Sequence, residues 1–230
     1  MSRLLALTLA AGTALMSTAA LAAPTPERVR GTVASVSGDT LTVRMADGHS
    51  VPVTLTEGTH YLEVAKSSLS HVAPGSYIGT AAKAIGSQLV ALEVVVFPPA
   101  LKGTGEGHYA WDRIPDTTLS GDDATSSTMT NGTVSAAAPL GGDTTVNSSM
   151  TNGTVSNAAE TGGAKQITVT YKGGQQIVIV PPTAPIVTFR LGTKADVTPG
   201  AAVFVNGLSD NGTVSARAVA VGIDGVKPPM

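Results

Sequence analysis

The feature that most constrains the fold of this chain is a long internal repeat of strand-like segments. Alternating apolar and polar residues, separated by Gly, Pro and Asp turns, are typical of short β-strands. Four such segments recur in the same order in the second half of the chain. The matched pairs are Leu41-Thr42-Val43 with Ile167-Thr168-Val169, Val51-Pro52-Val53 with Ile177-Val178-Ile179, Val72-Ala73-Pro74-Gly75 with Val197-Thr198-Pro199-Gly200, and Leu89-Val90-Ala91 with Val214-Ser215-Ala216.

The repeat predicts an all-β protein of two related modules, 29–98 and 150–222, followed by a C-terminal tail, 223–230. A small sheet that closes on itself hides its edges, so we expect each module to be an OB-like five-stranded barrel or half-barrel. Each copy carries a full core pattern, and each is therefore expected to fold on its own. The strands expected in the first module are 28–36, 41–45, 51–55, 77–81 and 89–97.

The first 22 residues have the pattern of a secretory signal peptide. Arg3 precedes the apolar stretch Leu4 to Met16, and Ala20-Leu21-Ala22 is a small-x-small cleavage site. This stretch is shorter than the ~20 apolar residues of a spanning helix, and no later stretch approaches that length. We expect cleavage after Ala22, no membrane span, and a periplasmic or secreted protein.

The composition argues against several classes of function. The chain has no cysteine, which excludes disulfides, thiolate metal sites and a lipid anchor on an N-terminal cysteine. The formal net charge is −2 and there is no basic run. Because nucleic acids and anionic membranes are recognised largely through Lys and Arg, we expect neither as a partner.

The region between the modules, 99–149, is dominated by Ser, Thr, Gly, Ala and Asp, which predicts a flexible linker. The heptapeptide Met129–Ser135 within it recurs as Met150–Ser156. Either copy could supply the first strand of the second module. The second copy lies nearer to the next strand at Ile167, and loop closure costs ~0.6 kcal/mol per doubling of length. We therefore expect the second copy in the sheet, by a modest margin.

The candidate binding residues lie in the segment GTGEGHYAWD, 103–112. Glu106, His108 and Asp112 are candidate ligands for a divalent ion, and Trp111 is a candidate binding residue. Three such ligands without a second His specify no metal. The preferred interpretation is a Gly-rich tether whose Trp111 packs against a module. No cofactor is predicted.

No catalytic motif is present. The chain has neither a Gly-x-Ser-x-Gly elbow nor a His-Glu-x-x-His pair, and its carboxylates are scattered. The remaining histidines are interpreted as solvated turn residues. The sequence therefore indicates a protein that is not an enzyme.

Several segments resemble a family of exported bacterial proteins of unknown function with tandem OB-like modules. The resemblance rests on GTGEGH…WD, on MTNGTV at 150–155, on TYKGGQQ at 170–176 and on the terminal Pro228-Pro229-Met230. Members are often labelled metal transporter permease components, but a permease needs spanning helices, which this sequence does not predict. The family has no established site residues, so none carry over. The duplicated MTN motif departs from the family pattern.

These observations favour an exported, non-enzymatic binding or interaction protein whose partner is an unknown protein or small ligand. The alternative is a periplasmic metal-handling accessory protein that uses Glu106, His108 and Asp112. A hydrolase is the third hypothesis.

Overall fold

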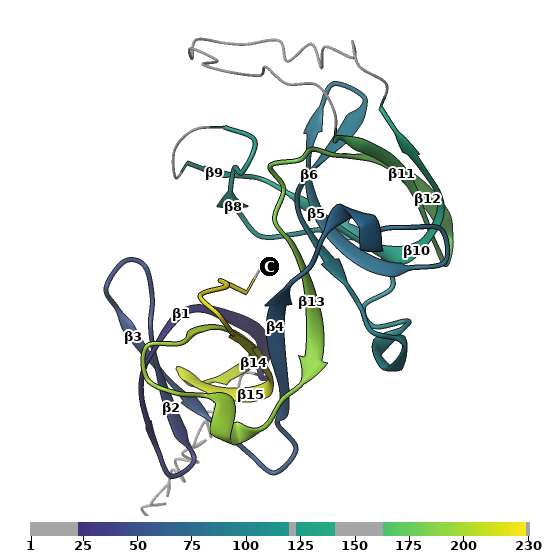
Figure 1. Ribbon diagram of the computed structural model, residues 1–230. Helices are drawn as coiled ribbons and strands as arrows, with labels where there is room; N and C mark the ends of the chain where they lie inside the picture. Colours follow the sequence, from purple (N-terminus) through teal and green to yellow (C-terminus); the bar gives the residue numbers. More distant parts are fainter. Residues whose placement is uncertain (1–22, 120–122, 141–162, 229–230) are drawn as a thin grey trace, which may run out of the picture.

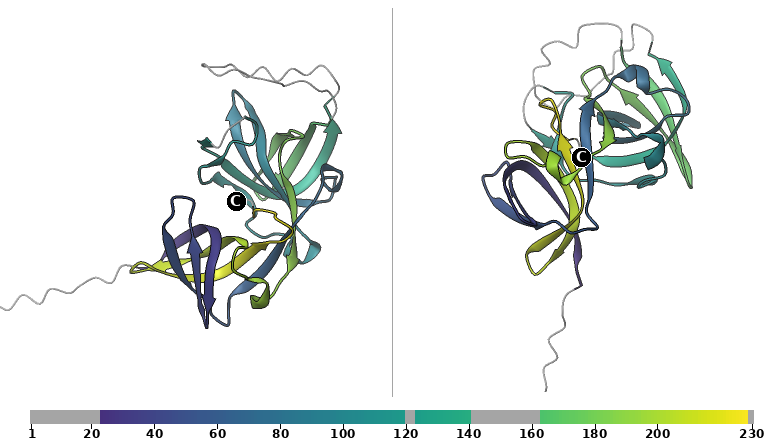
Figure 2. Two further views of the ribbon diagram at one scale, coloured as in Figure 1. Left: turned by 60° about the vertical axis from the view of Figure 1, so that its left-hand side comes forward. Right: turned by 60° about the horizontal axis from the view of Figure 1, so that its bottom comes forward.

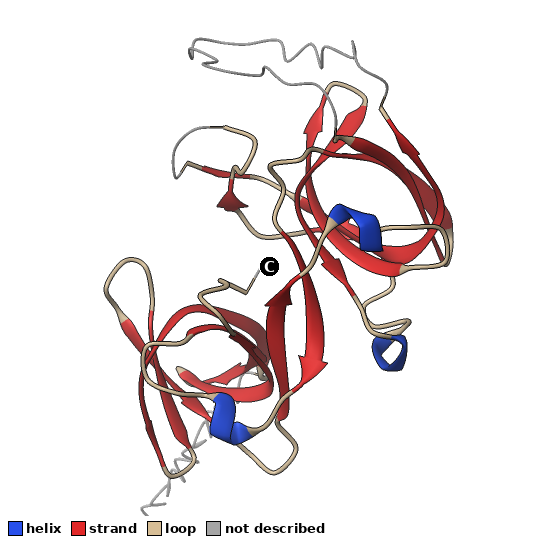
Figure 3. Cartoon of the chain, viewed as in Figure 1, coloured by secondary structure: helices blue, strands red, loops and turns tan. Residues whose placement is uncertain are grey.

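The structure, a computed structural model, describes residues 23–119, 123–140 and 163–228. The prediction of an all-β chain is confirmed, since the described residues form strands and three short 3-10 turns (Figure 3). The elements are β1 (Thr25–Ser37), β2 (Thr40–Arg44), β3 (Ser50–Thr54), β4 (His60–Lys66), η1 (Leu69–His71), β5 (Tyr77–Ile85), β6 (Gln88–Val96), η2 (Pro99–Leu101), β7 (Gly107–Ala110), β8 (Ile114–Pro115), β9 (Ala124–Thr125), β10 (Thr128–Pro139), β11 (Lys165–Tyr171), β12 (Gly174–Val180), β13 (Ile186–Leu191), η3 (Lys194–Asp196), β14 (Ala202–Asp210) and β15 (Thr213–Gly222).

The internal repeat is a structural repeat. The strands β10 to β15 are the counterparts of β1 to β6, in the same order and with equivalent pairings. η3 is likewise the counterpart of η1. For example, Val53 of the first copy pairs with Val214 of the second, and the equivalent pair is Val178 of the second copy with Leu89 of the first. From β3 onward, each residue of the first copy therefore corresponds to the residue 125 positions later. β7, β8 and β9 lie between the copies and have no counterpart.

The large sheet as a whole is not a closed barrel, but its pairings return to their starting strand twice. The cycle β1–β2–β3–β15–β14–β1 is called ring one here. The cycle β10–β11–β12–β6–β5–β10 is called ring two. Figure 1 shows the two rings as separate groups of strands. Each ring takes three strands from one copy of the repeat and two from the other.

The connectors β4 and β13 carry the chain from one ring to the other and pair with each other antiparallel. Val64 of β4 lies opposite Phe189 of β13, which is its own counterpart in the repeat. An approximate twofold axis therefore passes through this pair. Figure 2 shows the two rings from two further sides, again as separate groups of strands. All three phenylalanines of the chain gather around it in one apolar cluster, with Phe97 packed edge-on against Phe189 and Tyr77.

This exchange of strands differs from the expectation that 29–98 and 150–222 would each fold on its own. The core of ring one contains Val29 and Val33 from the first copy together with Val205 and Val219 from the second. The core of ring two is mixed in the same way. The physical reason lies in β4 and β13, which run straight, with strand partners on both sides, and so deliver the following hairpin to the other ring.

The interval between the modules also differs from the expected flexible linker, 99–149. Its described part forms η2 and β7 to β10. The first heptapeptide copy, Met129–Ser135, lies within β10 and pairs with β5 and β11. The prediction that the copy at 150–156 supplies this strand is therefore wrong for the described sheet. The second copy would shorten the connection after the strand but lengthen the connection before it by as much, so loop closure favours neither copy.

Gly132 offers a test of which copy forms the strand. A Cβ at this position would overlap the carbonyl group of Thr170 on the neighbouring strand. We expect Gly132→Ala to lower the free energy of unfolding by about 2 kcal/mol, the cost of forcing an extra carbon into a packed site. Gly153→Ala is the matched control, because the same heptapeptide surrounds it. Thermal denaturation should show a lower midpoint for the first variant only, and equal losses would contradict the assignment of β10.

Two further expectations fall outside the described residues, namely the signal peptide at 1–22 and the second heptapeptide copy. Within the described ranges, no helix is long and apolar enough to cross a membrane.

Candidate functional site

The segment 103–112 is held against ring two by β7, which pairs with the first half of β10. Asn131 of β10 is buried, and its amide nitrogen donates to the carbonyl oxygen of Gly105 at 2.8 Å and to the Tyr109 hydroxyl at 3.0 Å. Gly105 has a φ of +59°, and a Cβ there would lie 2.8 Å from the same amide nitrogen. The two most distinctive sequence motifs, GTGEGH…WD and MTN, are therefore the two sides of one contact.

Glu106 and His108 contact β10, β11 and the turn after β11. A carboxylate oxygen of Glu106 accepts a hydrogen bond from the backbone N–H of Lys172 at 2.9 Å. The His108 ring stacks on Tyr171, with centroids 6.3 Å apart, and its Nδ1 lies 2.8 Å from the Thr130 hydroxyl. The side chains of Glu106 and His108 therefore contact different residues.

Trp111 and Asp112 point toward ring one instead. The guanidinium carbon of Arg28 lies 3.9 Å from the centre of the Trp111 ring, a cation–π contact. Asp112 accepts from Arg28 at 2.9 Å and from Arg30 at 2.8 Å. These contacts tie the inserted segment to β1, and Trp111 also packs against an apolar cluster that includes Ala81, Leu92 and Met129.

The structure does not bring the three candidate metal ligands together. Asp112 forms ion pairs with two arginines of β1, while Glu106 and His108 contact β10, β11 or the turn after it. Within 23–119, 123–140 and 163–228, no group of three or more His, Cys, Asp or Glu side chains is arranged to hold a metal ion.

The Asp112 contacts predict a small stabilisation, because both partners are about a third exposed. We expect Asp112→Asn to lower the free energy of unfolding by about 1 kcal/mol. Urea titration followed by tryptophan fluorescence would measure it, since Trp111 is the only tryptophan. Asp47→Asn, which alters an exposed Asp–His contact, is the control. No difference between the two variants would contradict a structural role for Asp112.

A second ion pair fixes the segment that follows. Lys83 of β5 and Asp116 are both largely buried, and Lys83 Nζ lies 2.6 Å from an Asp116 carboxylate oxygen. The backbone N–H and the hydroxyl of Thr118 also donate to Asp116. Burial raises the pKa of Asp116, but the hydrogen bonds from Lys83 and Thr118 lower it by more, so the net pKa lies below its ordinary value.

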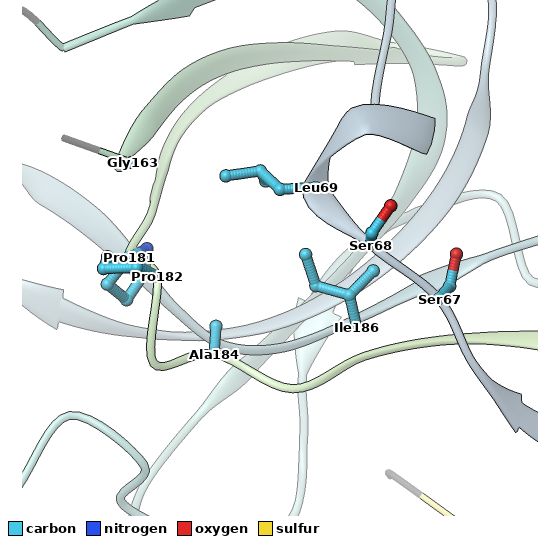
Figure 4. A pocket seen from close by; sticks show the side chains of 8 residues that line it. All are labelled: Ser67, Ser68, Leu69, Gly163, Pro181, Pro182, Ala184 and Ile186. Atoms are coloured by element: carbon cyan, nitrogen blue, oxygen red, sulfur yellow. The ribbon is translucent and has the colours of Figure 1, made fainter.

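A pocket of about 350 Å³ opens at the η1 end of ring two, away from these residues. It lies between η1 and the turn that leads from β12 into β13 (Figure 4). Its lining is mostly apolar, with hydroxyl groups on the side of η1 and no ionisable side chain. The lining residues are Ser67, Ser68, Leu69, Gly163, Pro181, Pro182, Ala184 and Ile186.

The serines of this pocket belong to a small polar network. Ser67 Oγ lies 3.1 Å and Ser68 Oγ 3.4 Å from Nδ1 of His71, which is exposed. Two hydroxyls that share one imidazole nitrogen can donate or accept hydrogen bonds at the rim. This arrangement suits recognition of a neutral polar atom on an otherwise apolar molecule.

The repeat explains why the pocket exists in ring two. The counterpart of Ile186 in ring one is Tyr61, and the counterpart of Ala184 is Thr59. Matching backbone hydrogen bonds show both equivalences. The Ile186 carbonyl accepts from Ser67 N–H, as the Tyr61 carbonyl accepts from Gly192 N–H. Ala184 N–H donates to the Pro181 carbonyl, as Thr59 N–H donates to that of Thr56. Ring two therefore carries the smaller side chain at both positions.

Sequence reasoning missed the pocket residues. The available signal is the difference between the two copies at these positions, but the sequence pattern does not predict a strand at 60–66, which hides its correspondence to 186–191. Comparison with known proteins adds no constraint, because no family model, curated protein or solved structure matches the chain.

Proposed function

We propose that this chain is an exported, non-enzymatic binding protein that holds a small neutral ligand in the pocket at the η1 end of ring two. The observation that carries the proposal is the contrast between the rings. Ring two leaves space between Ala184 and η1, while ring one carries the larger Thr59 and Tyr61 at the positions of Ala184 and Ile186. Such concave, mostly apolar sites with a few polar groups are typical of ligand pockets.

The strand order supports OB-like barrels as the scaffold. In ring one, β1, β2 and β3 of the first copy are followed by β15 and β14 of the second. In ring two, β10, β11 and β12 of the second copy are followed by β6 and β5 of the first. β3 runs parallel to β15, as β12 does to β6, and the other neighbours within each ring are antiparallel. A five-stranded, partly open Greek-key barrel of this kind leaves its ends available for binding. Export to the periplasm or beyond is the localisation that the leader pattern supports.

The test is an NMR titration of the full mature chain with 4-methylphenol and 4-methylcyclohexanol, two neutral molecules small enough for the pocket. Saturable shifts of the amide signals of Leu69, Ala184 and Ile186 are expected with at least one probe. The Ile186→Tyr variant places in ring two the side chain that ring one carries, and it should abolish these shifts while the protein stays folded. Absence of saturable shifts with both probes would overturn the proposal.

A further inference from the structure

Ring one indicates what kind of group the pocket of ring two accepts, an inference that rests on the proposed function. Tyr61 pairs with Val219 on β15, as Ile186 pairs with Val94 on β6, so the two side chains leave equivalent backbone positions. Tyr61 is half-buried and packs against the core of ring one. Ring one thus supplies its own phenol ring where ring two has an isoleucine and a pocket.

The backbone surroundings of Tyr61 also match those of Ile186. Gly192 N–H, just before η3, donates to the Tyr61 carbonyl oxygen, as Ser67 N–H, just before η1, donates to that of Ile186. Lys194 begins η3 as Leu69 begins η1. A phenol placed beside Ile186 would therefore lie next to the segment before η1, where Ser67 and Ser68 line the pocket.

The size and chemistry of the pocket agree with this occupant. A dry cavity of about 150 Å³ is enough to hold benzene, and this pocket of about 350 Å³ leaves room for a substituted ring. Proline and leucine side chains offer flat apolar contacts on two sides. An ionised ligand would lose its hydration without a charged partner in the lining, which is costly.

We propose that the pocket of ring two binds a small neutral molecule through a para-substituted phenol ring, which adds beside Ile186 the aromatic group that ring one carries as Tyr61. The ring packs between Ile186 and Pro181, and its hydroxyl forms hydrogen bonds with the serines before η1. No covalent step is involved.

The experiment compares 4-methylphenol with 4-methylcyclohexanol, which has a similar outline but no aromatic ring, by NMR titration of the full mature chain. We expect 4-methylphenol to bind about tenfold more tightly, as an aromatic preference of ordinary size would give. Ile186→Tyr should weaken its binding at least about tenfold. The double variant Ser67→Ala, Ser68→Ala should weaken the binding of 4-methylphenol and have a smaller effect on the binding of its O-methyl ether.

Tyr61→Ile is the reciprocal variant, because it gives ring one the isoleucine that ring two carries. It should create a second 4-methylphenol site, seen at the amides of Val219 and Lys194, and the ligand should raise its melting temperature more than that of the wild type. Should Tyr61→Ile fail to fold, Ile186→Phe, which fills the pocket without a hydroxyl, still tests the site in ring two.

The outcomes separate the two proposals. Equal or tighter binding of 4-methylcyclohexanol would overturn the phenol inference and leave the binding function standing. Binding of 4-methylphenol that persists unchanged in Ile186→Tyr and Ile186→Phe would place the site elsewhere and also overturn the inference. Failure of both probes to bind would overturn the proposed function itself.

Discussion

Separated into residues 23–98 and 99–230, the chain is expected to form native rings only when the two pieces are mixed. Neither piece contains all the strands of a ring. The first lacks β14 and β15, which complete ring one, and the second lacks β5 and β6, which complete ring two. Each piece alone would expose an unpaired strand edge and half a core.

The expected loss is the whole stability of the fold, on the order of 5–15 kcal/mol. Core residues such as Val29, Leu41 and Val53 of the first piece lie against Val205 and Val219 of the second. Burial of each such side chain contributes about 1.5–3 kcal/mol. Without the partner piece, those contributions are absent while the cost of ordering the strands remains.

Amide dispersion in NMR spectra of each piece and of the equimolar mixture would show which samples are folded. Size-exclusion chromatography would detect a one-to-one complex. The unbroken chain 23–230 is the control. Two well-dispersed, monomeric pieces that do not combine would contradict the exchange, because each copy would then close its own ring as the sequence alone suggests.

Replacing Asp116 by Asn is expected to lower the free energy of unfolding by about 3 kcal/mol at neutral pH. The variant leaves the ammonium group of Lys83 largely buried without its carboxylate, and breaking a buried ion pair from one side is costly. Chemical denaturation of both proteins measures the difference. Asp39→Asn is the control, since its ion pair with Lys194 is exposed and its loss should leave the midpoint unchanged.

The effect of Asp116 should depend on pH in a defined direction. Its pKa in the folded chain is lowered, so the carboxylate stabilises the fold at pH values above the ordinary carboxyl value of 3.8. That contribution falls as the pH drops below this value and through the lowered pKa, where the folded chain also takes up the proton. The gap between wild type and Asp116→Asn should therefore narrow in acid. A gap that widens in acid would contradict the assigned ion pair.

The sequence predicted most of the strands, because alternation and turn residues are local signals. All five strands expected in the first module are present as β1, β2, β3, β5 and β6. β4 was not predicted. The alignment of the copies was also displaced by one residue at the third strand, where Val53 corresponds to Val178 and not to Ile179. The hairpin before it is one residue shorter in the second copy, and a short turn hides such a shift.

The exchange of strands could not be predicted from the sequence. Either copy of the closing hairpin has the pattern to pair with either copy of the first strand, since Gly75 N–H donates to Val134 in ring two as Gly200 N–H does to Val33 in ring one. The choice depends on the direction in which β4 and β13 run, which is a tertiary property. The same holds for the candidate site, where spacing placed Glu106, His108 and Asp112 close together but strand geometry turned them to different neighbours.

The strand exchange also sets the order in which a chain leaving the ribosome or a secretion channel can complete its parts. The five strands of ring two are complete at Val180, the end of β12. Ring one begins at Thr25 yet waits for β15, which ends at Gly222. Folding that usually proceeds from the N-terminus is here reversed, because the first strands to emerge are the last to be enclosed. A chain with this layout reaches its final form only after almost all of it has emerged.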